Sequence, residues 1–306
     1  MKSIEEIRHL TTKLPFLIEP NITYMSAGFG NYNYLVQEGN NKYVLRIKKG
    51  TETQFSDSLE REYIFLKYFT TKGIDFCPQV YYYDKKDKFL LESFLTGTET
   101  AQKDLSHTQI DLFAKQLHRM YSLDVSEFSE FCQENQCQEF GYVSPLESLQ
   151  TYGFARFERA RQLGLETEAS AWIETRLNNN LSYLETTQDK NQELGFDWGD
   201  IQSNVIIGND GQMFFYDFEH ATISNSFGLC YVKIHGSFTE TQFTHLVDRC
   251  AFYFDTSTKT LIDQIRSEEI ITRVNDVVWA AMMWAETNEM KFKKIMEARI
   301  NLVENI

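Results

Sequence analysis

The order of secondary-structure signals along this chain limits its possible folds more than any other feature. Up to about residue 92, short β-branched and aromatic runs alternate with turn residues, as is typical of strands. The strands are predicted at 22–27, 34–37, 42–47, 80–83 and 88–92. One helix, predicted at 56–69 from the spacing of Leu59, Tyr63 and Leu66, interrupts them. We therefore expect an α+β protein that begins with a five-stranded antiparallel sheet.

Helical periodicity dominates from about residue 109 onward. Two apolar stripes at helical spacing are Ile110, Phe113, Leu117 and Met120, and Ile173, Leu177, Leu181 and Leu184. Ser144 followed by Pro145 and Glu147 is a helix start, and this helix is predicted to run to about Gln162. The tail 271–305 is predicted to form one long helix or two. The larger part of the chain is thus expected to be mainly helical.

One β-hairpin is predicted inside this helical part. Val205–Ile207 and Met213–Tyr216 are short strand-forming runs joined by Asn209-Asp210-Gly211, whose Asp-Gly step suits a tight turn. Such a hairpin would hold Asp200 and Asn204 at one end and return Asp217 beside them. Phosphoryl transfer needs a carboxylate to orient the attacking hydroxyl and oxygen ligands to hold Mg²⁺. These three residues have the side chains required for that chemistry.

Charge and cysteine content bound the function classes. With 44 acidic and 30 basic residues the net charge is −14, which argues against nucleic acid or an anionic membrane as partner. A cationic small substrate would suit this charge, and so would a purely solubilising acidic surface. Five cysteines without paired ligand spacing favour free thiols in a reducing compartment. No run of about 18 apolar residues occurs, so we expect a soluble cytoplasmic protein without a membrane partner.

The chain resembles the aminoglycoside phosphotransferase and choline kinase superfamily from about Thr23 to Arg299. In that family a histidine, a glycine or asparagine and an aspartate precede an asparagine, and a hairpin then leads to an Asp-Phe-Glu type step. The counterparts are Trp198-Gly199-Asp200, Asn204 and Asp217-Phe218-Glu219. The resemblance implies a two-lobed protein-kinase-like fold. Its N-terminal nucleotide-binding lobe would be 1–92, its hinge 93–97, and its helical C-terminal lobe, with the catalytic loop and substrate site, 98–306.

The resemblance also implies roles for the hairpin residues. Asp200 would be the catalytic base, and Asn204 and Asp217 would be the Mg²⁺ ligands. Gln202 is similar to the choline kinase version of the loop. Two departures stand out: Trp198 replaces the histidine, and the step from aspartate to asparagine is 204 − 200 = 4 rather than five. Since misplacement of about 1 Å impairs catalysis, an inactive site or an acidic hairpin without catalytic meaning remains an alternative.

Further residues are implied on the nucleotide side. Ser26, Gly28 and Gly30 lie between two predicted strands, where small residues let backbone N–H groups approach phosphates. An ordinary hairpin turn is the alternative interpretation of this loop. Arg46 stands in the third strand, where the family often presents a lysine to the phosphates. Arginine can do the same with its planar fork of donors.

Two more elements of the resemblance concern the nucleotide. Glu62 would be the helix glutamate that pairs with Arg46, and Glu60 is the near alternative. The stretch that ends at Gly97 is similar to the family's hinge. Backbone groups near Glu92 and Phe94 would there meet the edge of adenine.

Candidates for substrate contact are Glu219, Trp279 and Trp284. Tryptophan faces attract quaternary ammonium groups, but a spacing of five does not put both rings on one helical face, so a core role is an equal alternative. Together these features predict a Mg²⁺-dependent kinase that transfers the γ-phosphate of ATP or GTP to a hydroxyl of a small, cationic, aminoglycoside- or choline-like acceptor. The rivals are a pseudokinase that binds nucleotide or a protein without transfer, and an acidic interaction module that binds neither nucleotide nor Mg²⁺.

Overall fold

The chain divides into two compact units. The computed structural model describes residues 4–28, 30–49, 58–137, 140, 144–187, 194–199, 201, 204–225 and 228–305. Unit 1 comprises Met1–Phe140 and Phe196–Thr222, and unit 2 comprises Gly141–Gly195 and Ile223–Ile306. The predicted hairpin therefore folds with the N-terminal strands, and residues 93–97 lie within unit 1. The lobe boundaries at 92 and 98 stay a prediction.

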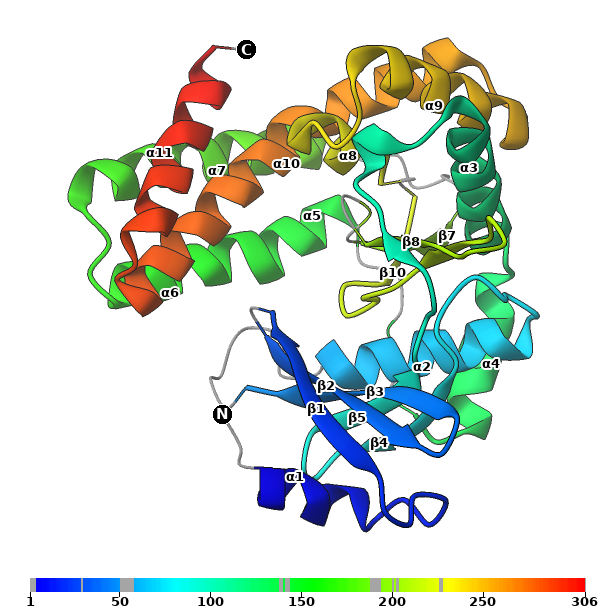
Figure 1. The fold of residues 1–306 in the computed structure, drawn as a ribbon. Coiled ribbons are helices and arrows are strands. Elements are labelled where there is room, and N and C mark those ends of the chain that lie inside the picture. Colours follow the sequence, from blue (N-terminus) through cyan, green and yellow to red (C-terminus); the bar gives the residue numbers. More distant parts are fainter. Residues whose placement is uncertain are drawn as a thin grey trace. The chain divides into compact units, whose positions relative to one another are not determined.

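Unit 1 contains the five-stranded antiparallel sheet, in the order β1-β2-β3-β5-β4 (Figure 1). Its strands are β1 (Asn21–Ala27), β2 (Asn31–Glu38), β3 (Asn41–Lys48), β4 (Val80–Asp84) and β5 (Phe89–Ser93). All five predicted strands are confirmed, with β2 beginning at Asn31 rather than Tyr34. β3 and β5 are interior strands, so their residues pair on both sides.

The two faces of this sheet differ in polarity. One face carries apolar side chains, among them Leu45 and Leu91, which pack with Ile7 and Leu10 of α1 (Ile4–Thr11). Residues opposite each other in an antiparallel ladder point to the same face, and neighbours along a strand alternate. Arg46 lies opposite both Asn33 of β2 and Leu90 of β5, and it therefore points to the other face. Figure 1 shows α1 on one side of the sheet and α2 on the other.

Aromatic side chains form much of the remaining core of unit 1. Its helices are α2 (Ser58–Thr71), α3 (His107–Tyr121) and α4 (Val125–Glu134), with the short turn η1 (Gln102–Asp104) before α3. The predicted start of α2 at Ser56 lies outside the described residues. Phe65 of α2 packs 4.9 Å from Phe128 of α4, and Tyr68 packs 5.3 Å from Phe196 of β7 (Gly195–Asp197), measured between ring centroids. These separations lie in the favourable range for aromatic pairs.

The predicted hairpin is present. β8 (Val205–Ile207) and β9 (Met213–Phe215) pair with β6 (Thr98–Glu99) in a three-stranded sheet. Gly208 N–H donates to Gln212 O at 2.8 Å and closes the connection. Gly211, with φ +82°, takes the left-handed conformation for which the Asp-Gly step is suited. The hairpin prediction is therefore confirmed.

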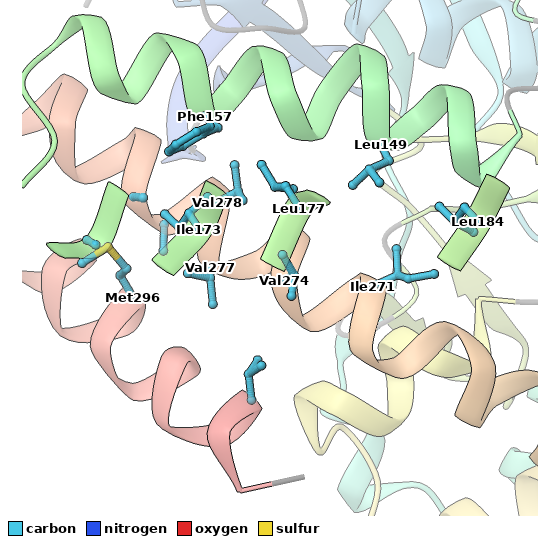
Figure 2. Packing of buried hydrophobic residues seen from close by; sticks show 14 residues of the cluster. Leu149, Phe157, Ile173, Leu177, Leu184, Ile271, Val274, Val277, Val278 and Met296 are labelled. Carbon is cyan, nitrogen blue, oxygen red and sulfur yellow. The ribbon is translucent and has the colours of Figure 1, made fainter. Parts of the chain in front are cut away.

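Unit 2 is built around one long helix. Its elements are α5 (Pro145–Ser148), the π-helical turn η2 (Leu149–Phe154), α6 (Ala155–Gln162), α7 (Thr167–Thr187), α8 (Leu229–His235), α9 (Glu240–Tyr253), α10 (Thr258–Thr287) and α11 (Met290–Glu304), and β10 (Thr222–Ser224) connects the units. Figure 2 shows Val274 and Val278 of α10 beside Ile173 and Leu177 of α7. The predicted tail is thus two helices, separated at Asn288, whose φ of +55° ends α10.

The helix predicted to begin at Ser144 is confirmed as far as Gln162. The Ser144 hydroxyl accepts a hydrogen bond from Glu147 N–H at 3.1 Å, and Pro145 occupies the first helical position. The π-helical turn lies between α5 and α6, at a point where Gly153 is buried. Across the described residues, none of the helices has both the length and the apolar character of a membrane span.

Candidate functional site

Arg46 lies at the centre of the candidate site in unit 1. It is 6% exposed on β3. Its Nη1 is 2.5 Å from Oε1 of Glu62 in α2, and its Nη2 is 2.5 Å from Oδ1 of Asp217, just after β9. Burial alone would lower the pKa of Arg46, but the carboxylates of Asp217 and Glu62 outweigh it and raise the pKa well above its usual value. The planar guanidinium thus joins two carboxylates from distant parts of the chain.

Glu62 connects α2 to the segment that follows Asp217. This side chain is fully buried, and its Oε1 also accepts a hydrogen bond from the backbone N–H of Phe218 at 2.9 Å. Burial raises the pKa of the Glu62 carboxyl, and the Arg46 guanidinium opposes the rise. Glu60, the alternative partner, instead pairs with Lys85 at 2.9 Å. Of the two glutamates, the structure brings Glu62 to Arg46.

Trp198 holds the backbone of the turn that carries Asp217. Asp217 has φ +65°, a left-handed conformation that a short polar residue tolerates at some cost. The indole N–H of Trp198 lies 3.1 Å from Tyr216 O and 3.2 Å from Asp217 O. Its ring is buried and stacks on Phe215 at 4.5 Å between centroids. The residue that departs from the family pattern is therefore a structural support of the site, which sequence reasoning missed.

Asn204 lies at the base of the hairpin, opposite Tyr216. Its backbone oxygen accepts a hydrogen bond from Tyr216 N–H at 3.2 Å, and the residue is 8% exposed. Asp200, the predicted base, and Gln202 lie outside the described residues. Before Asp200, Gly199 N–H donates to Asp197 Oδ1 at 3.0 Å. The structure thus brings the backbone of Asn204 to Tyr216, the residue before Asp217, and the roles of Asn204 and Asp200 stay predictions.

The glycine loop between β1 and β2 approaches Glu219. Asn31 is buried, and its Nδ2 donates to Oε2 of Glu219 at 2.8 Å. Glu219 Oε2 is also 4.0 Å from Nη2 of Arg46. A Cβ placed on Gly30 would lie 3.6 Å from the same carboxylate, whereas Gly28 has open space. Sequence reasoning did not single out Asn31, although it directly follows Gly30.

Several polar atoms near Arg46 are buried and have no hydrogen-bond partner among the residues that the structure describes. They are Oδ1 of Asn31, Oδ1 of Asn33, Nε of Arg46, Oε2 of Glu62 and Oε2 of Glu92. The sheet register puts Asn31, Asn33 and Arg46 on one face, and Glu62 reaches it from α2. Buried polar groups in folded proteins are almost always hydrogen-bonded, so such a concentration indicates a place for water, an ion or a ligand.

The other predicted residues take more ordinary positions. Ser26 is exposed, and its hydroxyl accepts a hydrogen bond from Asn33 Nδ2 at 3.2 Å. Phe94 N–H donates to Lys42 O at 3.3 Å, and the Lys42 ammonium lies 5.7 Å from the ring of Phe94. The backbone of Phe94 is thus partly engaged with the neighbouring strand.

Both predicted tryptophans belong to the core of unit 2. Trp279 and Trp284 are half-buried on α10 and pack against its apolar cluster. Arg299 lies 5.4 Å from the ring of Trp279, and Lys293 lies 4.7 Å from that of Trp284. Each ring therefore already faces a cation of the protein itself.

Comparison with known proteins identifies the family. The sequence model of the phosphotransferase enzyme family matches residues 21–225. The chain belongs to this family. The predicted resemblance is confirmed, although no curated protein sequence matches the chain.

Solved structures share the fold of this phosphotransferase family member. The gentamicin complex of APH(2'')-IIa is similar with a TM-score of 0.71 and 14% identity, covering 100% of this chain and 97% of that one. Choline kinase LicA from Streptococcus pneumoniae is similar with a TM-score of 0.67 and 13% identity, covering 99% of this chain and 100% of that one. A Plasmodium vivax ethanolamine kinase is similar with a TM-score of 0.64 and 14% identity, covering 92% of this chain and 81% of that one. The predicted two-lobed protein-kinase-like fold, with its five-stranded antiparallel sheet and larger helical part, is confirmed.

Proposed function

We propose that this chain is a small-molecule kinase that transfers the γ-phosphate of ATP or GTP to a hydroxyl group of a small cationic acceptor. The supporting observation is the set of buried, unpartnered polar atoms beside Arg46, where Glu62 and Asp217 converge. A nucleotide brings both donors and acceptors to such a site, and phosphoryl transfer depends mainly on positioning and on charge stabilisation.

Mg²⁺ is the proposed cofactor, with Asp217 and Asn204 as its ligands. The carboxylates of Glu62, Asp217 and Glu219 lie within 4.0 Å of the guanidinium of Arg46, and carboxylate oxygens are ligands that a hard cation prefers. In the described part of the chain, no three His, Cys, Asp or Glu residues converge as a metal site. Mg²⁺ commonly uses one or two carboxylates plus phosphates and water, so a carboxylate of Asp217 with the amide oxygen of Asn204 is a donor set that suits it.

The protein's own residues would then act around Arg46. Arg46 would bind phosphate oxygens through its guanidinium, and Glu62 would hold that guanidinium in place. Asp200 would accept the proton of the acceptor hydroxyl and orient its oxygen toward the phosphate. Bound Mg²⁺ would neutralise phosphate charge.

The acceptor class is proposed from charge. A net charge of −14 favours a cation, and the similar structures are named for gentamicin, choline and ethanolamine. Arg299 and Lys293 already lie over Trp279 and Trp284, so an acceptor cation would have to displace them or use the opposite face of each ring. Glu219 stays a proposed acceptor contact.

The second candidate function is a pseudokinase. The observation that favours it is Trp198 in place of the family's histidine, together with the four-residue step from Asp200 to Asn204. Trp198 is buried and stacked, so the replacement is built into the core. A pseudokinase would bind the nucleotide and not transfer its phosphate.

Phosphorylation assays that combine ATP or GTP with aminoglycosides, choline-like and other small alcohols test this proposal. Asp200→Asn should abolish transfer and leave Mg²⁺-nucleotide binding nearly intact, because asparagine keeps the shape but does not accept the proton. Asp217→Asn should lose both, because the metal loses a carboxylate ligand. Asp263→Asn, at an exposed position, is the control. Binding through Asp217 without transfer to any acceptor would favour the pseudokinase, and absence of nucleotide binding would refute both.

A further inference from the structure

Glu92 is a buried carboxyl on the same face of the sheet as Arg46. It lies in the interior strand β5, opposite Val44 of β3 and Val80 of β4, and is 5% exposed. Leu90 is opposite Arg46, and side chains two residues apart along a strand share a face. The carboxyl of Glu92 and the guanidinium of Arg46 therefore project to one side.

Within the described part of the chain, no hydrogen bond satisfies this carboxyl completely. Its Oε2 is buried without a hydrogen-bond partner there, while the two terminal nitrogens of Arg46 bind Glu62 and Asp217. Burial raises the pKa of Glu92 to about 7 against the opposing effect of Arg46, and Asp217 adds to the rise. An interior strand position between two valines would be filled more stably by an apolar side chain. A polar side chain held there under such conditions calls for a ligand group that binds it.

The nucleotide base is the part of the ligand that would reach Glu92. This step rests on the proposed function, which puts the phosphates at Arg46 and Asp217. Glu92 lies two residues further along the strand, about 7 Å, toward the segment 93–97. Phosphates would be repelled by a carboxylate, whereas a base is separated from its phosphates by the length of the ribose. An exocyclic group of the purine therefore fits the unpartnered oxygen.

We propose that the Glu92 carboxylate accepts a hydrogen bond from the exocyclic amino group of adenine and thereby selects ATP over GTP. An ionised carboxylate is only an acceptor. Adenine presents an amino donor at position 6, and guanine presents an oxygen acceptor there. GTP would thus put the guanine oxygen at position 6 against the Glu92 carboxylate. Two acceptors would face each other in a buried place, which costs binding free energy. Glu92 is a specificity residue in this proposal and takes no part in the chemistry.

Calorimetric titration at pH 8.5 with Mg²⁺ and ATP, GTP or inosine triphosphate tests the inference. Wild type should bind ATP at least about tenfold more tightly than GTP, since a hydrogen bond to a charged group contributes about that factor. Inosine triphosphate shares the 6-oxo group with GTP but lacks its 2-amino group, so it should bind as weakly as GTP. 2′-Deoxy-ATP should bind like ATP, because the ribose hydroxyl is not the group recognised.

Two substitutions should reduce the preference for ATP over GTP in different ways. Glu92→Gln should tighten GTP binding, because an amide both donates and accepts. Glu92→Leu should weaken ATP binding by about tenfold and should not weaken GTP binding, because leucine removes both the acceptor for the amino group and the acceptor opposed to the 6-oxo group. Glu134→Gln, at an exposed position of α4, should leave both affinities unchanged. Thermal unfolding of each variant checks that it is folded.

Distinct outcomes would overturn this inference. Equal affinities of wild type for the three nucleotides, tight binding of inosine triphosphate, or a preference unchanged in Glu92→Leu would each remove Glu92 from base selection while leaving the kinase proposal in place. Failure of every nucleotide to bind would overturn the kinase proposal and this inference together. Weak binding of 2′-deoxy-ATP would assign the recognition to the ribose instead.

Discussion

At the scale of single residues, the site depends on how one arginine meets several carboxylates. Arg46 can bind Glu62 and Asp217 at once because its two terminal nitrogens diverge in a fixed plane, which a lysine ammonium lacks. Among the described residues, this leaves Oε2 of Glu92, on the same sheet face, without a hydrogen-bond partner. The energetic cost of the Glu92 carboxylate should therefore appear in the stability of the protein.

As the pH rises through neutrality, Glu92→Gln should lose less stability than wild type. The folded protein raises the pKa of Glu92 from 4.5 to about 7, so the folded state holds this proton more tightly than the unfolded state. Its contribution to stability is therefore full below about pH 4.5 and is lost as the pH rises through about 7. Glutamine does not titrate, so relative to wild type the variant should gain stability between pH 5 and 8, on the order of 2 kcal/mol.

Urea unfolding of wild type and Glu92→Gln at pH 5 and pH 8 measures this difference. Other carboxylates titrate in both proteins, so their contribution cancels in the comparison. Glu134→Gln is the matched control, because an exposed glutamate should change stability equally at both pH values. If the difference in the free energy of unfolding between Glu92→Gln and wild type is the same at pH 5 and pH 8, burial does not raise the pKa of the Glu92 carboxyl.

At the scale of elements, the sequence predicted what local patterns determine. The five strands, the hairpin and the helix start at Ser144 follow from alternation, turn residues and capping, which act over a few residues. The contacts that assemble the site act over far longer separations. Glu62 accepts from Phe218 N–H 156 residues away, and Asn31 donates to Glu219 188 residues away. Only the family resemblance indicated Glu62, and nothing in the sequence indicated Asn31.

The same limit applies to residues that depart from the family pattern. Trp198 could be identified in the sequence only as a replacement for histidine. Its hydrogen bonds to the backbone of Tyr216 and Asp217 depend on how the hairpin returns, which no local pattern specifies.

Two glycines with the same backbone conformation should respond differently to alanine. Gly199 and Gly211 both have φ +82°. A Cβ on Gly199 would lie 2.2 Å from the backbone oxygen of His220, whereas a Cβ on Gly211 would meet nothing within 4 Å. Gly211→Ala should cost only the left-handed backbone penalty, about 1 kcal/mol. Gly199→Ala should cost about 3 kcal/mol or more, since the backbone itself must move.

Chemical denaturation of the two variants under identical conditions measures both costs. The hairpin turn serves here as the internal control, because its glycine pays the same conformational penalty without the steric one. Similar free energies of unfolding for both variants would contradict the close approach of Gly199 to His220. Because Gly199 directly precedes Asp200, transfer activity should also fall more in Gly199→Ala than in Gly211→Ala.

At the scale of the whole molecule, the described residues of the proposed nucleotide site all belong to unit 1. That unit is formed by two separate stretches of chain, Met1–Phe140 and Phe196–Thr222, and Arg46, Glu62 and Asp217 join them. A ligand that binds across this junction should therefore stabilise both stretches together. Unit 2 carries Trp279 and Trp284 and supplies none of the proposed nucleotide contacts.

Mg²⁺-nucleotide should slow amide hydrogen exchange in unit 1 selectively. At a ligand concentration one hundred times Kd, a ligand that binds only the folded state stabilises it by about 2.7 kcal/mol, or about a hundredfold in exchange that requires unfolding. The slowing should extend over β2, β3, α2 and the β8–β9 hairpin. Exchange in α10 should change little, because that helix packs in the core of unit 2.

Hydrogen exchange can be measured by mass spectrometry with nucleotide alone, with Mg²⁺ alone and with both. The comparison separates the contributions of nucleotide and Mg²⁺ to the protection. Protection should require both ligands and should disappear in Asp217→Asn, because loss of the carboxylate weakens the metal that holds the phosphates. Protection of β3 without protection of the hairpin would contradict the joining of the two stretches through Arg46. Equal protection of α10 and β3 would mean that the two units unfold as one cooperative body, since a ligand then slows the exchange of every amide that depends on that unfolding.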